Sequence, residues 1–314
     1  MRSHRIFAGM LAVLLGACAP AEVTPPTTQA QEEAAVPQLM TWDDLNALPR
    51  PSGAETIQWG PGATDIADLW LPSGPGPHPV TIMVHGGCWQ KSIADRTLMD
   101  WMASGLVQEG WAVWNIEYRG VDEAGGGYPG TFLDVSAAAD ALRGQADLYD
   151  LDLSRVTGIG HSAGGHLVLW LAARGQLPEG NLLKPTDPIA FRGVVVSGGL
   201  ADLEASRPVT LPSCLDAVYD QLTGPATSER PDPLAEVSPA RLLPVGVPFV
   251  SVHGDSDRIA PPVLAEQLAE KARAAGDDAG VIIVPETGHV ELVTPGTEAF
   301  RQQAAALKAF VEPD

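Results

Sequence analysis

The pentapeptide Gly160-His161-Ser162-Ala163-Gly164 places a serine among small residues between two apolar segments. The segment before it, Val156 to Ile159, predicts a short buried strand, and the segment after it predicts an apolar helix. A serine on a sharp strand-to-helix turn has a strained backbone, and glycines two positions to either side leave the space that this turn requires. The pattern is typical of the nucleophile in acyl transfer, so we predict that Ser162 has this role.

A serine hydroxyl is a weak nucleophile until a base removes its proton, which directs attention to the histidines. We predict His289 as the base, because it lies in the loop after the last predicted strand. We expect His4 to be removed with a signal peptide and His78 to lie in a turn before a strand. His161 occupies the variable position of the serine turn. We expect His166 to have a packing or capping role, and His85 and His253 to brace loops.

A third group, a carboxylate, must hold the imidazole in the correct tautomer and stabilise its charged form. The loop after the predicted strand Phe249 to Val252 offers Asp255 and Asp257. We assign Asp257 to the catalytic triad, and we expect Asp255 to be a turn residue that bonds nearby backbone. The resulting order of Ser, Asp and His along the chain is that of the α/β-hydrolases.

The segment His85-Gly86-Gly87-Cys88-Trp89 follows another predicted strand, Val80 to Val84. Glycines at such a point allow backbone N–H groups to turn towards a carbonyl oxygen that becomes an oxyanion during attack. A tight turn that needs glycine only for its backbone is the alternative. Because the segment follows a predicted strand that comes before the strand of the serine turn in the chain, we favour an oxyanion hole.

Short apolar runs alternate with helical stretches from about Gln58 onward, which predicts a mostly parallel sheet flanked by helices. The remaining predicted strands are Asp68 to Leu71, Ala112 to Glu117, Gly193 to Ser197 and Val281 to Val284. The predicted helices are Asp95 to Gln108, Asp134 to Ala146, Ala163 to Ala173, Pro262 to Ala275 and Glu298 to Phe310. The proline-rich interval from about residue 200 to 243 interrupts the alternation and predicts a small lid insertion.

The segment from His85 to Trp89 resembles the HGGxW motif of kynurenine formamidases and related small esterases, a BD-FAE-like group of the α/β-hydrolase superfamily. The resemblance extends through Asp68-Leu69-Trp70-Leu71-Pro72, Tyr118-Arg119, the serine turn, Ser238-Pro239 and the loop from His253 to Pro261. It implies an α/β-hydrolase fold and an oxyanion hole made by the amides of Gly87 and Cys88, joined by that of Ala163. In this family the position of Cys88 is often aromatic.

The first 17 residues contain two arginines, an apolar run and small residues, which is the pattern of a secretory signal peptide. The tetrapeptide that ends at Cys18 resembles a bacterial lipobox and implies lipid attachment to its sulfur; an ordinary signal peptide is the alternative. Residues 18–50 are predicted to be a flexible tether and residues 51–314 a catalytic domain. We therefore expect a bacterial cell-envelope protein that contacts the membrane only through its lipid anchor.

The formal net charge of −20 argues against binding of nucleic acid or an anionic lipid surface by charge. The cysteines, histidines and carboxylates have no metal-ligand spacing, so we expect no metal and no cofactor. Gly125-Gly126-Gly127 lacks the lysine of a phosphate loop and is interpreted as a turn. An oxidising compartment would permit Cys88 and Cys214 to pair, and the sequence leaves this question open.

These residues together predict a serine hydrolase that cleaves esters of small substrates through an acyl-enzyme. An arylformamidase would share every motif, although such an enzyme acts on a cytoplasmic metabolite and an exported location fits it poorly. A peptidase is compatible with the fold, but the chain lacks the large additional domain of long peptidases of this kind. A non-catalytic surface-binding lipoprotein is disfavoured because all triad and oxyanion residues are retained. The oligomeric state is left open.

Overall fold

The computed structural model describes residues 38–212 and 214–312. The predicted signal peptide, the predicted lipidation site Cys18 and the tether up to residue 37 lie outside the described residues.

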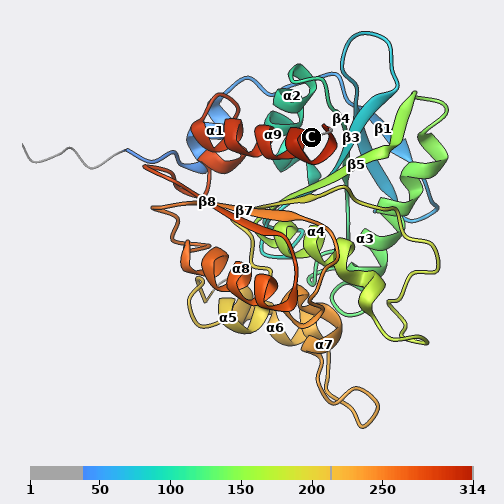
Figure 1. Cartoon of the computed structure of the whole chain (residues 1–314), viewed down its shortest axis with the longest axis vertical. Coiled ribbons are helices and arrows are strands. Elements are labelled where there is room, and N and C mark those ends of the chain that lie inside the picture. The colour runs from blue at the N-terminus through green and yellow to red at the C-terminus, as the bar shows by residue number, and fades with distance from the viewer. Residues whose placement is uncertain (1–37, 213, 313–314) are drawn as a thin grey trace, which may run out of the picture. The chain divides into compact units, whose positions relative to one another are not determined.

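An eight-stranded sheet runs through the centre of the folded unit, in the order β1-β2-β4-β3-β5-β6-β7-β8 (Figure 1). Strands β3 to β8 are parallel to one another, whereas β2 is antiparallel to both of its neighbours, β1 and β4. The α/β-hydrolase fold expected from the sequence is therefore confirmed. The strands are β1 (Glu55–Gln58), β2 (Ile66–Trp70), β3 (His78–Val84), β4 (Ala112–Ile116), β5 (Leu151–His161), β6 (Val194–Ser197), β7 (Phe249–Gly254) and β8 (Ala279–Val284).

Helices cover both faces of the sheet because the parallel strands are apolar on both sides. Along β6, Val194 and Val196 belong to the core beneath α3, α4 and α8, whereas Val195 belongs to the core beneath α1, α2 and α9 (Figure 1). The long helices are α2 (Asp100–Gln108), α3 (Gly130–Ala141), α4 (Ala163–Ala173), α8 (Val263–Ala275) and α9 (Glu298–Val311).

Parallel strands bring the predicted site residues together because their carboxyl ends meet at one edge of the sheet. Gly87 follows β3, and Ser162 lies between β5 and α4. Asp257 follows β7, and His289 follows β8. Four loops that are distant in the sequence therefore converge on one region.

Residues 38–50, predicted as the end of the tether, belong instead to the folded unit, which begins at Gln38. They contain helix α1 (Trp42–Ala47), which begins with a capping box between Thr41 and Asp44. Leu45 of this helix is fully buried. Arg50 forms an ion pair of 2.7 Å with Asp100 of α2. The boundary of the catalytic domain therefore lies before α1 and not after residue 50.

The interval between β6 and β7 contains the predicted insertion and forms the short helices α5 (Leu203–Ser206), α6 (Leu215–Thr223) and α7 (Leu234–Val237). These helices lie on the same side of the sheet as α8 (Figure 1). An ion pair between Asp202 and Lys271 joins the start of the insertion to α8.

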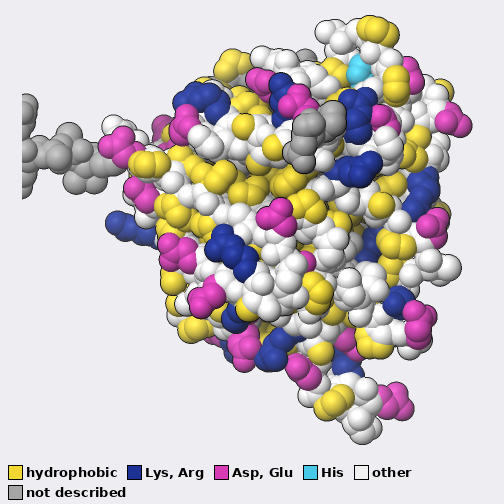
Figure 2. Space-filling model, in the orientation of Figure 1, with side chains coloured by type: hydrophobic (Ala, Val, Ile, Leu, Met, Phe, Trp, Pro, Cys, Tyr) yellow, Lys and Arg dark blue, Asp and Glu magenta, His cyan; other side chains and the backbone are white. Residues whose placement is uncertain are grey.

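One face of the folded unit mixes both signs of charge. Figure 2 shows Lys and Arg side chains interspersed with Asp and Glu over the face drawn. No helix within the described residues is long and apolar enough to cross a membrane.

Candidate active site

The serine turn has the geometry that its sequence predicts. Ser162 has φ 56° and ψ −118°, a conformation that costs a non-glycine residue about 1–3 kcal/mol. A Cβ on Gly160 would lie 2.1 Å from the carbonyl oxygen of Gly164, and one on Gly164 would lie 2.0 Å from that of Val84. Gly160 must therefore be glycine for β5 to fit against the start of α4, and Gly164 must be glycine for α4 to fit against the end of β3. The resulting turn places Ser162 in the lining of a pocket.

His289 and Asp257 form a buried hydrogen-bonded pair. The Nδ1–H of His289 donates to Oδ2 of Asp257 over 2.6 Å. The other oxygen, Oδ1, accepts from the amides of Ile259 at 2.8 Å and Ala260 at 3.0 Å. Burial alone would raise the pKa of Asp257, but electrostatic attraction to the His289 ring, the hydrogen bond from that ring and the bonds from these two amides lower it. Asp257 is therefore an ionised carboxylate that fixes the tautomer of His289.

This tautomer leaves Nε2 of His289 free to accept a proton. Ser162 and His289 line the same pocket. Within the described residues no direct hydrogen bond joins them, and catalytic hydrogen bonds of this kind are often long before substrate binds. The structure thus brings the predicted nucleophile, base and carboxylate together.

Gly198 and His161 hold the imidazole of His289 in place. Gly198 has φ 52°, and a Cβ on it would lie 3.2 Å from Cε1 and Nδ1 of His289. On another side, the ring centroid of His161 lies 4.3 Å from that of His289. The Nε2 of His161 bonds the carbonyl oxygen of His289 at 3.1 Å. Burial lowers the pKa of His161 well below its usual range, so its ring is neutral and Nε2–H is the donor.

The amides of Gly87, Cys88 and Ala163 are the oxyanion donors that the sequence predicts. Gly87 and Cys88 line the pocket beside Ser162, and Ala163 is the first residue of α4. In the part of the chain that the structure describes, none of these three N–H groups donates a hydrogen bond. Gly87 at φ 104° and Cys88 at φ 52° have left-handed backbones.

A buried charged network contacts the segment from His85 to Lys91, which contains this loop. Within this network the sequence predicts only a bracing role for His85. The ring nitrogens of His85 bond the carbonyl oxygen of Gly86 at 2.7 Å and Oε1 of Glu117 at 2.9 Å. Lys91 donates to Oε2 of Glu117 at 2.7 Å. The hydroxyl of Tyr118 donates to the carbonyl oxygen of His85 at 3.0 Å. The two ends of the oxyanion loop are thereby joined through one carboxylate.

The pocket has a volume of about 230 Å³ and mainly apolar walls. The oxyanion loop and the segment after it contribute Ile93, Ala94 and Leu98, and the Asp257 loop contributes Ile259. The predicted lid contributes no lining residue among those described.

Helix α1 supplies the rest of the wall through Trp42 and Asn46, which sequence reasoning missed. The Trp42 ring makes edge contacts with the rings of His161 and His289, with centroids 6.1 and 6.4 Å apart. The capping box at Thr41 and Asp44 was the available signal that a helix begins there.

The remaining candidates have structural positions. Asp255 accepts from the hydroxyl of Ser256 and the amide of Thr287, as expected for a turn residue. His166 is fully buried and accepts a hydrogen bond from the indole of Trp89. The structure joins Cys88 to Cys214 in a disulfide, which answers the question that the sequence left open. Within the described residues no group of three or more ligating side chains is placed to hold a metal ion.

Comparison with solved structures shows the fold. A truncated carbohydrate esterase from gut microbiota matches with a TM-score of 0.68 and 23% identity, covering 84% of this chain and 98% of that one. Esterase B from Lactobacillus rhamnosis matches with a TM-score of 0.69 and 21% identity, covering 82% and 84%. Esterase 2 from Thermogutta terrifontis, with butyrate bound, matches with a TM-score of 0.64 and 18% identity, covering 82% and 93%.

Comparison of the sequence with protein families identifies the group. A search among curated proteins finds no match. Residues 67–272, which span most of the chain, match the BD-FAE family. The match includes the oxyanion loop, the serine turn and Asp257, while His289 follows it. The chain therefore belongs to the BD-FAE family, a group of esterases with the α/β-hydrolase fold.

Proposed function

We propose that the protein is a serine esterase that hydrolyses carboxylic esters of small substrates through an acyl-enzyme. The observation that carries the proposal is the position of the His289–Asp257 pair in the pocket that contains Ser162 and the oxyanion-loop amides. Several proteins of the same fold are esterases by name, which supports ester hydrolysis over formamide or peptide hydrolysis. Retention of the whole site disfavours a purely binding role.

The mechanism follows from the geometry. Nε2 of His289 takes the hydroxyl proton of Ser162 as Oγ forms a bond to the acyl carbon, and Asp257 stabilises the imidazolium. The carbonyl oxygen becomes an oxyanion that accepts from the amides of Gly87, Cys88 and Ala163. The imidazolium then gives its proton to the leaving alkoxide oxygen as the ester bond breaks, so that the leaving group departs as an alcohol. Water, activated by His289, attacks the acyl-enzyme and releases the acid and Ser162.

The size and lining of the pocket support short or small acyl and alcohol groups. A volume of about 230 Å³ lies below the usual range of drug-sized ligand sites, which is roughly 300–1,000 Å³. Turnover of p-nitrophenyl acetate, acetylated xylose oligomers and N-formylkynurenine, measured in parallel, ranks the substrate classes. Preference for N-formylkynurenine would replace the esterase assignment with a formamidase.

The test of the proposal is the variant Ser162→Ala. We expect it to hydrolyse p-nitrophenyl acetate at less than about one-thousandth of the wild-type rate, because the nucleophile is removed. A fluorophosphonate probe should label the wild-type protein and leave the variant unlabelled. The choice of probe is supported by Thermogutta terrifontis esterase 2, a protein that is phosphonylated by sarin.

The matched control is Ser104→Ala on α2, a position that does not line the pocket. It should retain wild-type activity and labelling. Hydrolysis by folded Ser162→Ala at the wild-type rate would refute the assignment of the nucleophile.

We also propose export and lipid attachment at Cys18, on the basis of the signal-like segment and the lipobox-like tetrapeptide. The disulfide between Cys88 and Cys214 supports an oxidising location. Fractionation of cells that produce the full chain tests the anchor: wild type should sediment with membranes, and Cys18→Ala should not. Equal distribution of both proteins in the soluble fraction would contradict lipid attachment.

A further inference from the structure

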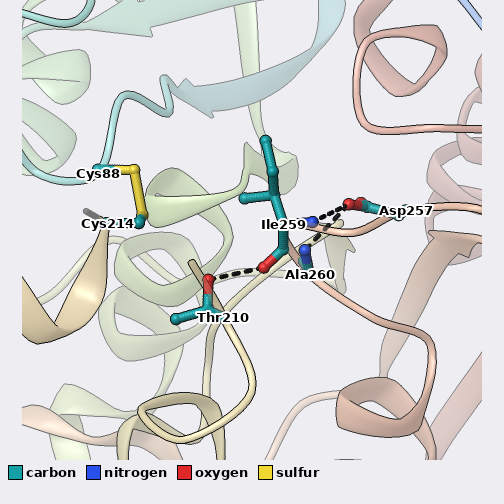
Figure 3. The surroundings of a disulfide bond; sticks show 6 residues. All are labelled: Cys88, Thr210, Cys214, Asp257, Ile259 and Ala260. Carbon is teal, nitrogen blue, oxygen red and sulfur yellow. Dashed lines mark hydrogen bonds between the residues drawn. A yellow bond between two sulfur atoms is a disulfide. The ribbon is translucent and has the colours of Figure 1, made fainter. Parts of the chain in front are cut away.

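The insertion between β6 and β7 is bonded to loops on both sides of the catalytic pocket (Figure 3). Cys214, at the start of α6, is linked through its sulfur to Cys88 of the oxyanion loop. Thr210 donates its hydroxyl proton to the carbonyl oxygen of Ile259 over 2.7 Å. Cys88 and Ile259 both line the pocket. The insertion therefore contacts two residues of the pocket wall, although Thr210 and Cys214 do not line the pocket themselves.

On the oxyanion side, the bonded residue has a backbone that L-amino acids disfavour. Cys88 and Trp89 have φ values of 52° and 57°. Such conformations persist only where surrounding contacts impose them. Trp89 is held by burial and by its indole hydrogen bond to His166. For Cys88, the structure provides the covalent bond to Cys214.

On the other side, the contact reaches the carboxylate of the triad through one residue, Ile259. Thr210 holds the carbonyl oxygen of Ile259, while the amide of Ile259 donates to Oδ1 of Asp257. Figure 3 shows these bonds in sequence, from Thr210 through Ile259 to Asp257.

The insertion can hold these loops because α6 is itself fixed. Leu215, Val218 and Leu222 of α6 are buried in the core beneath α3, α4 and α8. Its last turn accepts the amide of Tyr128 at the carbonyl oxygen of Gln221 over 2.9 Å. Cys88 is thus linked to an element that packs independently of the pocket.

We propose that Cys214 is a positioning residue for the oxyanion hole: through the disulfide it holds the Cys88 amide at the angle that receives the oxyanion. The proposal rests on the proposed esterase function. Thr210 has a parallel and smaller role on the side of Asp257. In this proposal the insertion braces the catalytic loops. The sequence predicts a lid for the same segment, but none of its described residues lines the pocket.

The experiment compares the full chain as wild type, Cys214→Ser and Cys88→Ser/Cys214→Ser. Active sites are counted by fluorophosphonate labelling to completion, and kcat and KM for p-nitrophenyl acetate are measured per labelled site. Removal of one oxyanion donor lowers rates by roughly 10²–10³. For a donor that is misaligned but present we expect a fall in kcat of about tenfold or more, with little change in KM.

A second readout isolates the oxyanion. A trifluoromethyl ketone forms a tetrahedral adduct with serine and places a negative oxygen in the hole, so its inhibition constant should rise by the same factor as kcat/KM falls. A disulfide with only a structural role would lower the melting temperature and leave kcat per labelled site and the inhibition constant unchanged. That result would overturn the proposal.

The Thr210 contact is tested with an isosteric and a conservative variant. Thr210→Val should lower kcat, and Thr210→Ser, which retains the hydroxyl, should restore it. Glu204→Gln on α5 is the control for general disturbance of the insertion, because its ion pair with Arg241 lies on the exposed surface. Equal kcat in Thr210→Val and wild type would overturn the role of Thr210.

Folding failure of the cysteine variants does not end the test. Folded wild type can be reduced with a phosphine, and its thiols counted while circular dichroism verifies the fold. We expect kcat per labelled site to fall on reduction and recover on reoxidation; unchanged kcat with both thiols free would overturn the proposal. Wild-type protein without esterase activity would instead refute the proposed function, before any variant is compared.

Discussion

Trp42 is the residue whose position most directly connects the N-terminal segment to catalysis. Its ring lines the pocket and touches the rings of His161 and His289. Trp42→Ala should therefore open the pocket and loosen the imidazole. We expect KM for p-nitrophenyl butyrate to rise about fivefold, equivalent to about 1 kcal/mol of lost contact, and kcat to fall severalfold. Steady-state kinetics on the full chain measures both constants.

Two further variants separate the wall contact from the stability of the helix. Trp42→Phe keeps an aromatic ring and should give intermediate constants. Asp43→Ala changes an exposed residue of the same helix and should retain wild-type KM. If Trp42→Ala behaved like Asp43→Ala, Trp42 would have no role in the substrate site.

Residues with strong local signals could be predicted, and residues that depend on distant packing could not. Ser162 has its glycines beside it, and Asp257 and His289 follow apolar strands, so their loops could be placed on one edge of the sheet. Trp42 approaches His289 only after the whole chain has folded. Nothing in the spacing of Cys88 and Cys214 indicates that α6 brings one sulfur to the other.

Elements were predicted where burial imposed a clear pattern. Every buried parallel strand was identified, and α4 was predicted with its observed bounds, because apolar residues fill these segments. Strand β1 was missed because it is a short edge strand with mostly exposed residues. Helix α1 was missed because it is short and follows a polar segment, although Thr41 and Asp44 form a recognisable cap.

The surface that the insertion covers could not be predicted from its sequence. Its prolines and scarce apolar runs indicate an interruption of the alternating pattern, but they do not indicate which surface the segment covers. Leu215, Val218 and Leu222 of α6 are buried in the core beneath α3, α4 and α8, and no described residue of the insertion lines the pocket. Helix α1, a segment that the composition assigned to the tether, lines the pocket instead.

The folded unit contains two buried carboxyl groups, Glu117 and Asp100, whose protonation affects its stability. Glu117 is almost fully buried and faces His85, Lys91 and Arg96. Burial alone would raise its pKa, but the hydrogen bonds and charges of His85 and Lys91 lower it far below the usual range. Asp100 behaves in the opposite way, because burial raises its pKa to about 6 despite the hydrogen bond from Arg50.

The contributions of these two carboxyl groups to the unfolding free energy change in opposite directions as the pH rises. The folded state binds the proton of Glu117 less readily than the unfolded chain, so its contribution is present above the ordinary Glu pKa of about 4.3 and is lost as the pH falls below that value. The folded state binds the proton of Asp100 more readily. Its contribution is therefore present below an ordinary Asp pKa of about 3.9 and is lost as the pH rises through about 6.

The variant Glu117→Gln isolates the first contribution, because the effect of Asp100 is common to both proteins and cancels in their difference. Near neutral pH the variant should lose about 3–5 kcal/mol of unfolding free energy, since Lys91 and His85 lose a buried partner. The difference should narrow as the pH falls from about 5 towards 3. Over this range protons bind Glu117 more readily in the unfolded chain than in the folded one, which lowers the stability of wild type and not that of the variant. Urea unfolding at several pH values measures this difference, with Glu270→Gln at an exposed position of α8 as the control. A difference that stayed constant over this range would mean that Glu117 is not held ionised by its neighbours, and the charged support of the oxyanion loop would have to be abandoned.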